Sequence, residues 1–238
     1  MKSVFNFLLQ GVMGCSVLAF VSCQSPHLSD VFSVTEKQVG EMTAMDAKAY
    51  LHQHYAITEK DYDSNLCKVF ENTNSAADVA LLLKAGANPD AIIRKDSGQT
   101  LAHVACQAST ANSAWGMEVL KLLKAYGADF NKTDNMGYTP LHHAVSNRYA
   151  EACLFLLETC KVNTEIKHHL DLTPLLWAAC LGDRNDMIRL LISHGANVHA
   201  TAYDDKVNIL TYYKDRNEQE FCSYLMQLGV TPVDPSGR

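Results

Sequence analysis

The stretch from residue 134 to residue 144, Asp-Asn-Met-Gly-Tyr-Thr-Pro-Leu-His-His-Ala, decides the fold of this chain. Its Thr139-Pro140 pair indicates a helix start, because a threonine before a helix can cap free amide groups and a proline in the first helical position loses no hydrogen bond. Related stretches occur at 98–105 and 173–179. The sequence therefore predicts the same helix start at three places.

A second helix and a turn follow each copy at a nearly constant period. The equivalent turn positions fall at Gly86, Gly127, Cys160, Gly195 and Gly229, which are 41, 33, 35 and 34 residues apart. Cys160 stands where the others have glycine, so we expect its turn to differ, because the left-handed backbone at such a turn penalises a side chain. A period near 33 over five units predicts stacked repeats, none of which buries its faces alone.

These stretches resemble the ankyrin repeat, whose core reads Gly-x-Thr-Pro-Leu-His-x-Ala. The resemblance implies an all-α solenoid of about five helix-turn-helix repeats, of which the first and fifth, starting at Asn65 and Asn208, are degenerate. It also implies that the motif histidines, His103 and His142, tie neighbouring turns together through both ring nitrogens. The expected repeat domain is 61–232, with repeats at about 61–94, 95–133, 134–167, 168–202 and 203–232.

The flanks of the repeats carry their own signals. Residues 23–60 are expected to form a linker and an N-terminal capping helix, because Thr43 and Asp46 have the spacing of a capping box. The apolar residues expected to lay this helix on the first repeat are Ala49, Tyr50, Leu51 and Tyr55. Residues 233–238 are expected to be a flexible tail.

In the ankyrin family, partners contact the finger-like loops between repeats and the exposed face of each first helix. Carried over position by position, the resemblance implies these partner-binding residues: Asp96, Ser97, Gln99, Gln107, Asn135, Met136, Tyr138, Ser146, Asn147, His169, Leu170, Leu172, Leu181, Asp204, Asp205 and Arg216. Large apolar side chains exposed on an otherwise polar face are typical of a protein contact. The alternative is that Leu170 and Leu172 only pack an irregular turn, in which Asp171 replaces the usual glycine.

The first 22 residues have the pattern of an export signal. Lys2 precedes a largely apolar run from Val4 to Val21. The segment Phe20-Val21-Ser22-Cys23 resembles the box before the lipidated cysteine of bacterial lipoproteins, which implies lipidation of Cys23. Ordinary cleavage nearby and an uncleaved membrane anchor are the alternatives, since a run of about 18 residues only just reaches spanning length.

Charge and motif content argue against several functions. The net charge of −6, without a run of basic residues longer than two, disfavours nucleic acid as a partner. The ten histidines show no metal-ligand spacing, and no phosphate-binding loop is present. The six cysteines after the export segment are interpreted as small free hydrophobes. We therefore expect no catalytic residue, no cofactor and no metal site.

The sequence thus predicts a monomeric, non-catalytic module of the bacterial cell envelope that binds another protein through its ankyrin groove, either in the periplasm or at the outer membrane. Secretion, and anchoring at the cytoplasmic membrane, remain open as locations. Two functional alternatives also remain open, namely an accessory subunit that tethers or protects an envelope enzyme, and a cytosolic scaffold with a membrane anchor. The stretch 108–116, which contains Trp115, is an insertion that forms either a partner-specific loop or a longer helix.

Overall fold

A computed structural model of the chain describes residues 36–72, 75–107, 113–182, 185–213 and 218–233. The chain divides into two compact units, 1–93 and 94–238. The described residues are mostly helical, with only short strands of two or three residues. The predicted all-α repeat fold is confirmed. Within the described residues, no helix combines the length and the apolar character needed to cross a membrane.

The described residues of the first unit form the α-helices α4 (Glu36–Glu41), α5 (Ala44–Tyr55), α6 (Tyr62–Asn72) and α7 (Ala76–Ala85). A short 3-10 turn, Glu59–Asp61, precedes α6, and strand β1 (Ile92–Arg94) lies at the boundary with the second unit. Helix α5 packs against α7.

The capping box predicted at the start of α5 is present. The Asp46 amide donates to Thr43 Oγ1 at 3.1 Å, and the Thr43 amide donates to the Asp46 carboxylate at 2.9 Å. The residues that α5 buries completely are Ala47 and Leu51, which lie one turn apart on the same helix face. Ala49 is exposed, so its predicted contact with the first repeat is wrong, because it points away from the face that carries Ala47 and Leu51.

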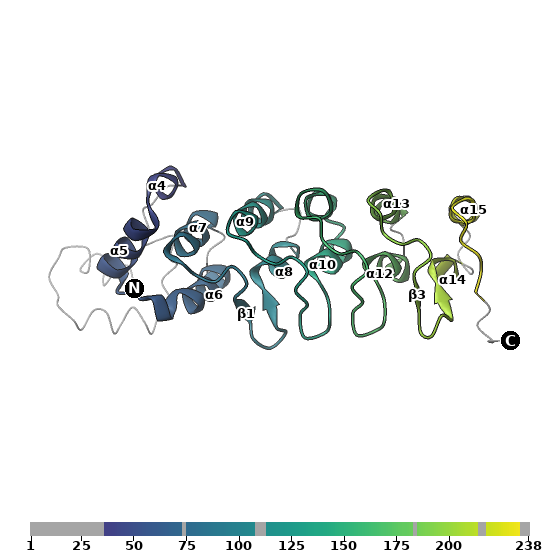
Figure 1. The fold of residues 1–238 in the computed structure, drawn as a ribbon, viewed down its shortest axis with the longest axis horizontal. Helices are drawn as coiled ribbons and strands as arrows, with labels where there is room; N and C mark the ends of the chain where they lie inside the picture. Colours follow the sequence, from purple (N-terminus) through teal and green to yellow (C-terminus); the bar gives the residue numbers. More distant parts are fainter. Residues whose placement is uncertain (1–35, 73–74, 108–112, 183–184, 214–217, 234–238) are drawn as a thin grey trace, which may run out of the picture. The chain divides into compact units, whose positions relative to one another are not determined.

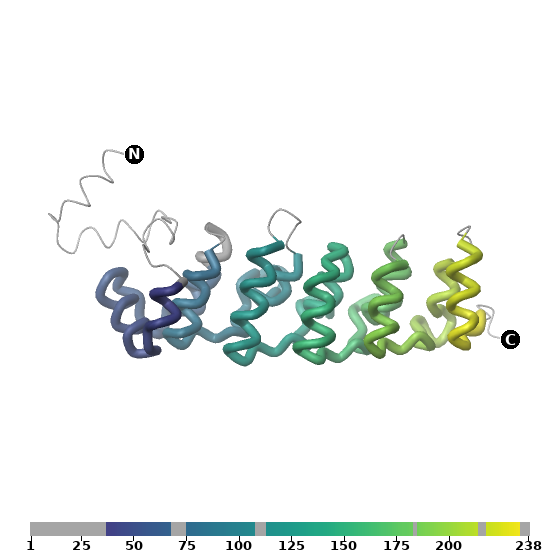
Figure 2. The backbone as a smooth tube through the Cα atoms, turned by 90° about the horizontal axis from the view of Figure 1, so that it is seen from above, coloured from purple at the N-terminus to yellow at the C-terminus, as the bar shows by residue number. Residues whose placement is uncertain are grey.

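The second unit repeats one helix pair four times. The first helices of the pairs are α8 (Leu101–Ala105), α10 (Pro140–Ser146), α12 (Pro174–Leu181) and α14 (Ile209–Tyr213). The second helices are α9 (Ser113–Ala125), α11 (Ala150–Leu154) with its continuation η3 (Phe155–Cys160), α13 (Asn185–Ser193) and α15 (Gln219–Gln227). The first helices lie side by side in one row (Figure 1) and the second helices in another (Figure 2).

Loops between the pairs project to one side of the second unit like fingers (Figure 1). Strand β2 (Gln99–Thr100) ends one finger, and β3 (Thr201–Ala202) pairs antiparallel with β4 (Val207–Asn208) in another. We define the finger loops as residues 95–99, 134–138, 168–172 and 203–207. They are called the second, third, fourth and fifth fingers, after the repeats to which they belong. The side of the second unit that they form with the first helices is called the inner face below.

The glycines predicted at the turn after each second helix have left-handed backbones. The φ angles are 110° at Gly86, 80° at Gly127, 90° at Gly195 and 83° at Gly229. In the repeat without a glycine, the left-handed residue is Lys161 (φ 54°) and not Cys160. The assignment of this turn to Cys160 was wrong by one residue, because η3 is a π-helix, whose wider turns take up one extra residue. With Lys161, the last three spacings all become 34.

Part of the insertion in the second repeat is helical. Helix α9 begins at Ser113 and includes Trp115 and Gly116. The longer-helix alternative therefore holds for residues 113–116, while residues 108–112 lie outside the described residues.

Candidate protein-binding face

The finger loops 134–138 and 168–172 each fold around one side chain that accepts backbone amides. In the third repeat, Asp134 Oδ1 accepts hydrogen bonds from the amides of Met136 at 3.0 Å and Tyr138 at 2.9 Å. Gly137 closes this turn with φ 79°, and a Cβ there would lie 2.9 Å from the Cα of His168. The turn therefore requires glycine both for its backbone angle and for the close approach of the next finger.

The fourth finger replaces both of these residues. His168 stands where the third finger has Asp134, and its Nδ1 accepts the Leu170 amide at 3.2 Å. Asp171 stands where the third finger has Gly137, and it is left-handed with φ 59°. The His169 amide donates to the Met136 carbonyl at 2.9 Å, so the third and fourth fingers are joined through their backbones.

The motif histidines join successive repeats as predicted. His103 Nδ1 accepts the Thr100 amide at 3.1 Å, and its Nε2 lies 3.1 Å from the Tyr138 carbonyl of the next finger. His142 repeats the arrangement with the Thr139 amide at 3.2 Å and the Leu172 carbonyl at 3.2 Å. Because Nδ1 accepts from a backbone N–H in both cases, Nε2 carries the proton and donates it to the carbonyl.

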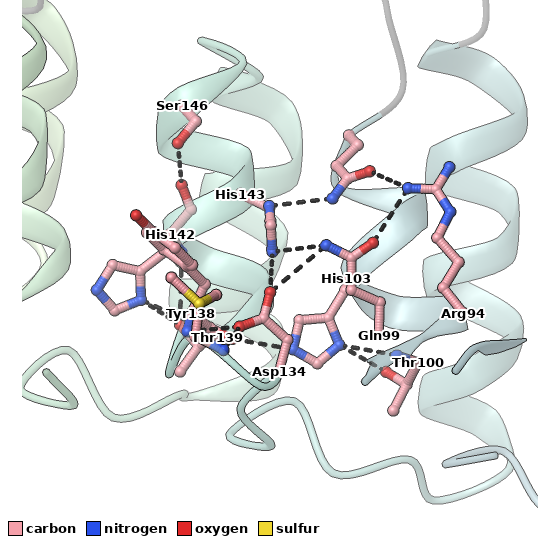
Figure 3. Close-up of polar contacts among 12 residues, drawn as sticks. Arg94, Gln99, Thr100, His103, Asp134, Tyr138, Thr139, His142, His143 and Ser146 are labelled. Carbon is pink, nitrogen blue, oxygen red and sulfur yellow. Dashed lines mark hydrogen bonds and ion pairs between the residues drawn. The ribbon is translucent and has the colours of Figure 1, made fainter. Parts of the chain in front are cut away.

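The N-terminal part of the inner face is a polar network. It is formed by Arg94, Gln99, Asp134 and His143 (Figure 3), together with Gln107, which bonds to Arg94 and His143. Arg94 Nη1 donates to Gln99 Oε1 at 3.1 Å and to Gln107 Oε1 at 3.0 Å. The Gln107 amide nitrogen lies 3.1 Å from His143 Nδ1, and His143 Nε2 lies 3.0 Å from Asp134 Oδ2. These bonds fix the side chains before any partner arrives.

Burial and charge keep this network in one protonation state near neutral pH. Burial lowers the pKa of His143 and outweighs the opposite effect of Asp134. Burial by itself raises the pKa of Asp134, but hydrogen bonds from His143 and from the Tyr138 and Met136 amides outweigh it, so that the pKa is lowered. The pair is thus a neutral imidazole that donates to a carboxylate.

The C-terminal part of the inner face is aromatic. The Tyr138 ring stacks on His168 with centroids 4.4 Å apart, and the Trp177 ring lies 5.5 Å from Tyr138 and 4.9 Å from His168. Trp177 Nε1 donates to Ser146 Oγ at 2.7 Å. Further along the chain, Tyr212 is half-buried and interacts with Cys180 at the exposed end of α12.

The predicted partner-binding residues fall into three classes by exposure. Those that are exposed are Asp96, Asn135, Met136, Asn147, His169, Leu170, Asp204 and Asp205, and those that are half-buried are Ser97, Gln107, Tyr138, Ser146 and Leu181. Two are buried, Gln99 at 7% exposure and Leu172 at 1%. Arg216 and the lipidation candidate Cys23 lie outside the described residues.

The two buried residues correct the predicted surface. Leu172 fills the core under the fourth finger, so the packing alternative is right for it, whereas Leu170 is 40% exposed and stays a surface candidate. Gln99 faces the interior because it bonds to Arg94 and lies 3.4 Å from Asp134. Neither side chain is available to touch a partner.

Sequence reasoning missed Trp177, Cys180 and Tyr212 on the inner face. The signal was present, because Trp177 and Tyr212 stand four residues after the helix starts at Thr173 and Asn208, as His143 does after Thr139. The fourth residue after the helix start is therefore an aromatic or imidazole ring in three successive repeats.

The cysteines and acids of the described residues do not gather into a reactive cluster. No group of three or more His, Cys, Asp and Glu side chains among the described residues could hold a metal ion. The six cysteines of this part of the chain are not joined in disulfide bonds. Burial raises the pKa of Cys153 to about 12 and raises that of Cys106 well above its usual value, which keeps both thiols protonated and unreactive.

Comparison with known proteins identifies the repeat. Residues 54–168 match the family model for ankyrin repeats in three copies, and residues 171–203 match the model for a single ankyrin repeat. Together, these matches cover more than half of the chain.

Several curated proteins are similar over about half of the chain. B-cell lymphoma 3 protein homolog of Mus musculus is 34% identical over 125 residues, which are 52% of this chain and 27% of the relative. NF-kappa-B inhibitor cactus of Drosophila melanogaster is 31% identical over 109 residues, 45% of this chain and 20% of the relative. Neurogenic locus Notch protein of the same species is 35% identical over 128 residues, 53% of this chain and 4% of the relative. The chain thus spans little more than a quarter of the length of these relatives, or less.

Proposed function

Since the chain belongs to the ankyrin-repeat family, we propose that it is a non-catalytic module that binds another protein through the inner face of its second unit. One ankyrin-repeat relative, cactus, is by its name an inhibitor of NF-kappa-B, which supports this proposal. The observation that carries it is the exposure of two large apolar side chains on bonded fingers, Met136 at 47% and Leu170 at 40%.

The composition of this face fits a protein contact. Exposed apolar side chains that cluster amid polar ones mark interaction sites on soluble proteins. The Tyr138 ring contacts the rings of His168 and His169, which bond to the backbone of Leu170 and Met136 respectively. Aromatic residues are enriched among the side chains that dominate binding energy. The polar network adds Gln107 and His143 as hydrogen-bonding groups held in fixed positions.

The test is partner capture with the full-length chain and the double substitution Met136→Ala with Leu170→Ala. Loss of both side chains removes exposed apolar area only, so we expect capture to weaken at least about tenfold, because hot-spot truncations typically cost 2 kcal/mol or more. The melting temperature should change little, because both side chains are exposed.

The matched control is Tyr126→Ala with Met226→Ala, which removes exposed apolar side chains outside the inner face. This control should bind like the unaltered chain. Equal capture by the Met136/Leu170 variant and the control would refute the proposed face.

We propose in addition that the module is exported and anchored through a lipid on Cys23. The support is the N-terminal sequence, in which Lys2, the apolar run to Val21 and the box before Cys23 follow one another in the order of a lipoprotein signal. Expression in a bacterium with and without Cys23→Ala, followed by cell fractionation, tests this. The unaltered chain should sediment with membranes and the variant should not, while recovery of both in the cytosol would overturn the proposal.

A further inference from the structure

We propose that the C-terminal half of the inner face binds an arginine or lysine side chain, presented by an extended segment of the protein partner, and that Trp177 and Tyr212 receive it. The proposal rests on the proposed function and names the partner chemistry at the same face. Four observations carry it: the row of rings, the charge around them, the contrast with the polar network, and a similar contact elsewhere in the second unit.

The rings form a row across successive repeats. His143, Trp177 and Tyr212 occupy the same position of three first helices, and Tyr138 lies 5.5 Å from Trp177. Cys180 is close enough to both Tyr138 and Tyr212 to add to the pKa increase that burial causes in each. Tyr203, 44% exposed, lies near Tyr212 at the outer end of the row. The ring faces of this row carry negative electrostatic potential, which attracts a cation.

The charges next to the row favour a cation as well. Helices α12 and α14 contain no charged residue. The acids of the adjoining fingers are Asp171, Asp204 and Asp205, and Asp171 accepts the Tyr203 amide at 2.7 Å. Lys167 is bonded to Asp171 at 2.9 Å, and Lys206, Asp204 and Asp205 are exposed. Three of these five described charged residues are acidic and two are basic, so they carry a small negative charge beside the uncharged helices α12 and α14.

The polar network at the other end of the inner face differs in charge and in its acceptors. The charge of Arg94 is balanced there by the Asp134 carboxylate, and the carbonyl acceptors of Gln99 and Gln107 are already engaged with Arg94. These balanced charges and engaged acceptors attract a partner cation less than the aromatic end does. This difference sets the direction in which an extended segment lies, with apolar side chains on Met136 and Leu170 and the cation over Trp177.

The second unit already contains the same kind of contact. The guanidinium carbon of Arg189 lies 4.0 Å from the centre of the Tyr224 ring and 5.2 Å from that of Phe221. This pair lies on α13 and α15, among the second helices. A cation at Trp177 and Tyr212 would repeat between the chain and its partner an interaction that the chain makes within itself.

The experiment begins with selection from a phage library of random twelve-residue peptides on the immobilised full-length chain. We expect enrichment of Arg or Lys next to apolar residues. The best peptide is then titrated against the chain by isothermal calorimetry. Trp177→Leu, which keeps an apolar side chain but removes the ring, should weaken binding about fivefold to thirtyfold, and Trp177→Phe should retain most of it.

The controls separate the cation from general apolar contact. Citrulline in place of the peptide's arginine keeps the shape but removes the charge, and it should weaken binding by a similar factor. Tyr126→Leu, at an exposed tyrosine outside the inner face, should leave binding unchanged.

Two outcomes would overturn the inference in different ways. If selected peptides lack Arg and Lys, or bind equally with citrulline, but lose affinity to the Met136/Leu170 variant, the cation is wrong and the proposed face stands. If no selected peptide responds to Trp177→Leu or to the Met136/Leu170 variant, both the inference and the proposed face fail.

Discussion

In three buried histidines of the second unit, the same ring nitrogen accepts a hydrogen bond from the backbone. In His103, His142 and His168, Nδ1 accepts a backbone amide, from Thr100, Thr139 and Leu170 respectively. A proton on Nδ1 would replace each bond with a repulsive contact between two donors. Burial lowers the pKa of His103 to about 4, that of His142 to about 3 and that of His168 to about 4, from an ordinary value of 6.5.

The free energy of unfolding is therefore expected to depend on pH between about 6.5 and 4. As the pH falls through 6.5, the unfolded chain takes up protons that the folded chain refuses, so stability is highest above this range and decreases within it. Urea unfolding at pH 7, 5.5 and 4.5 measures the slope. His142→Leu, which copies the natural Leu176 of the next repeat, should lower stability at pH 7 and flatten the slope.

The control for this prediction is His199→Leu, at an exposed histidine of the same unit. It should leave the slope unchanged. Equal slopes in the His142→Leu variant and the unaltered chain would show that the buried imidazole of His142 does not govern the acid response.

Sequence alone predicted some residues well and others not at all. The roles of His103 and His142 followed from the motif, because both bonding partners of each ring are backbone groups that every repeat supplies. The role of His168 could not be predicted from the motif. Its Nδ1 accepts a backbone amide in the position where Asp134 accepts one in the neighbouring finger, and the sequence pattern does not show that an imidazole can replace a carboxylate there. The burial of Leu172 was also ambiguous, since an apolar residue in a finger fits either a contact surface or a packed turn.

At the scale of elements, the turn after η3 shows how a repeat absorbs an irregular residue. The other three turns of the second unit end in glycine, but this one places Lys161 in a left-handed conformation. The sequence showed that glycine was missing, and it predicted a different turn. It did not show the shift by one residue, because a π-helical turn has no composition that distinguishes it from an α-helical one.

Lys161→Gly is expected to stabilise the second unit. A left-handed backbone destabilises an L-residue by about 1 to 2 kcal/mol. Glycine avoids this cost, but its greater freedom in the unfolded chain reduces the gain in stability by about half. The net gain of about 0.5 to 1 kcal/mol should raise the melting temperature by roughly 1 to 4 °C in a calorimetric scan.

Lys161→Ala tests the cause of this gain. Alanine removes the same exposed side chain but keeps the Cβ, so it should not stabilise the chain. If alanine raises the melting temperature as much as glycine does, the gain comes from loss of the lysine charge and not from relief of the backbone.

At the scale of the whole molecule, the spacing of the repeats predicted the stacked fold, but it did not predict where the chain divides into compact units. Turn spacing is set by the length of one helix pair, so five turns suffice to reveal the stack. The boundary between the compact units at 93/94 depends on contact density instead. It groups the first repeat with α4 and α5. The sequence predicted that the helix now seen as α5 packs on the first repeat, but no residue pattern marks the boundary itself.

The second unit, residues 94–238, is expected to fold and bind without the first. In a repeat protein each repeat contacts only its neighbours, and three or more repeats suffice for a stable stack. This unit holds four, with fully buried leucines such as Leu141 and Leu156 between its helices, and it carries every candidate residue of the inner face. The fragment 94–238 should therefore unfold in one cooperative transition by circular dichroism. It should also bind the peptide selected on the full-length chain with an affinity within about threefold of that chain, whereas the fragment 1–93 should not bind it. A folded 94–238 fragment that fails to bind would place part of the binding site in the first unit, and a non-cooperative melt would show that four repeats are too few for this sequence.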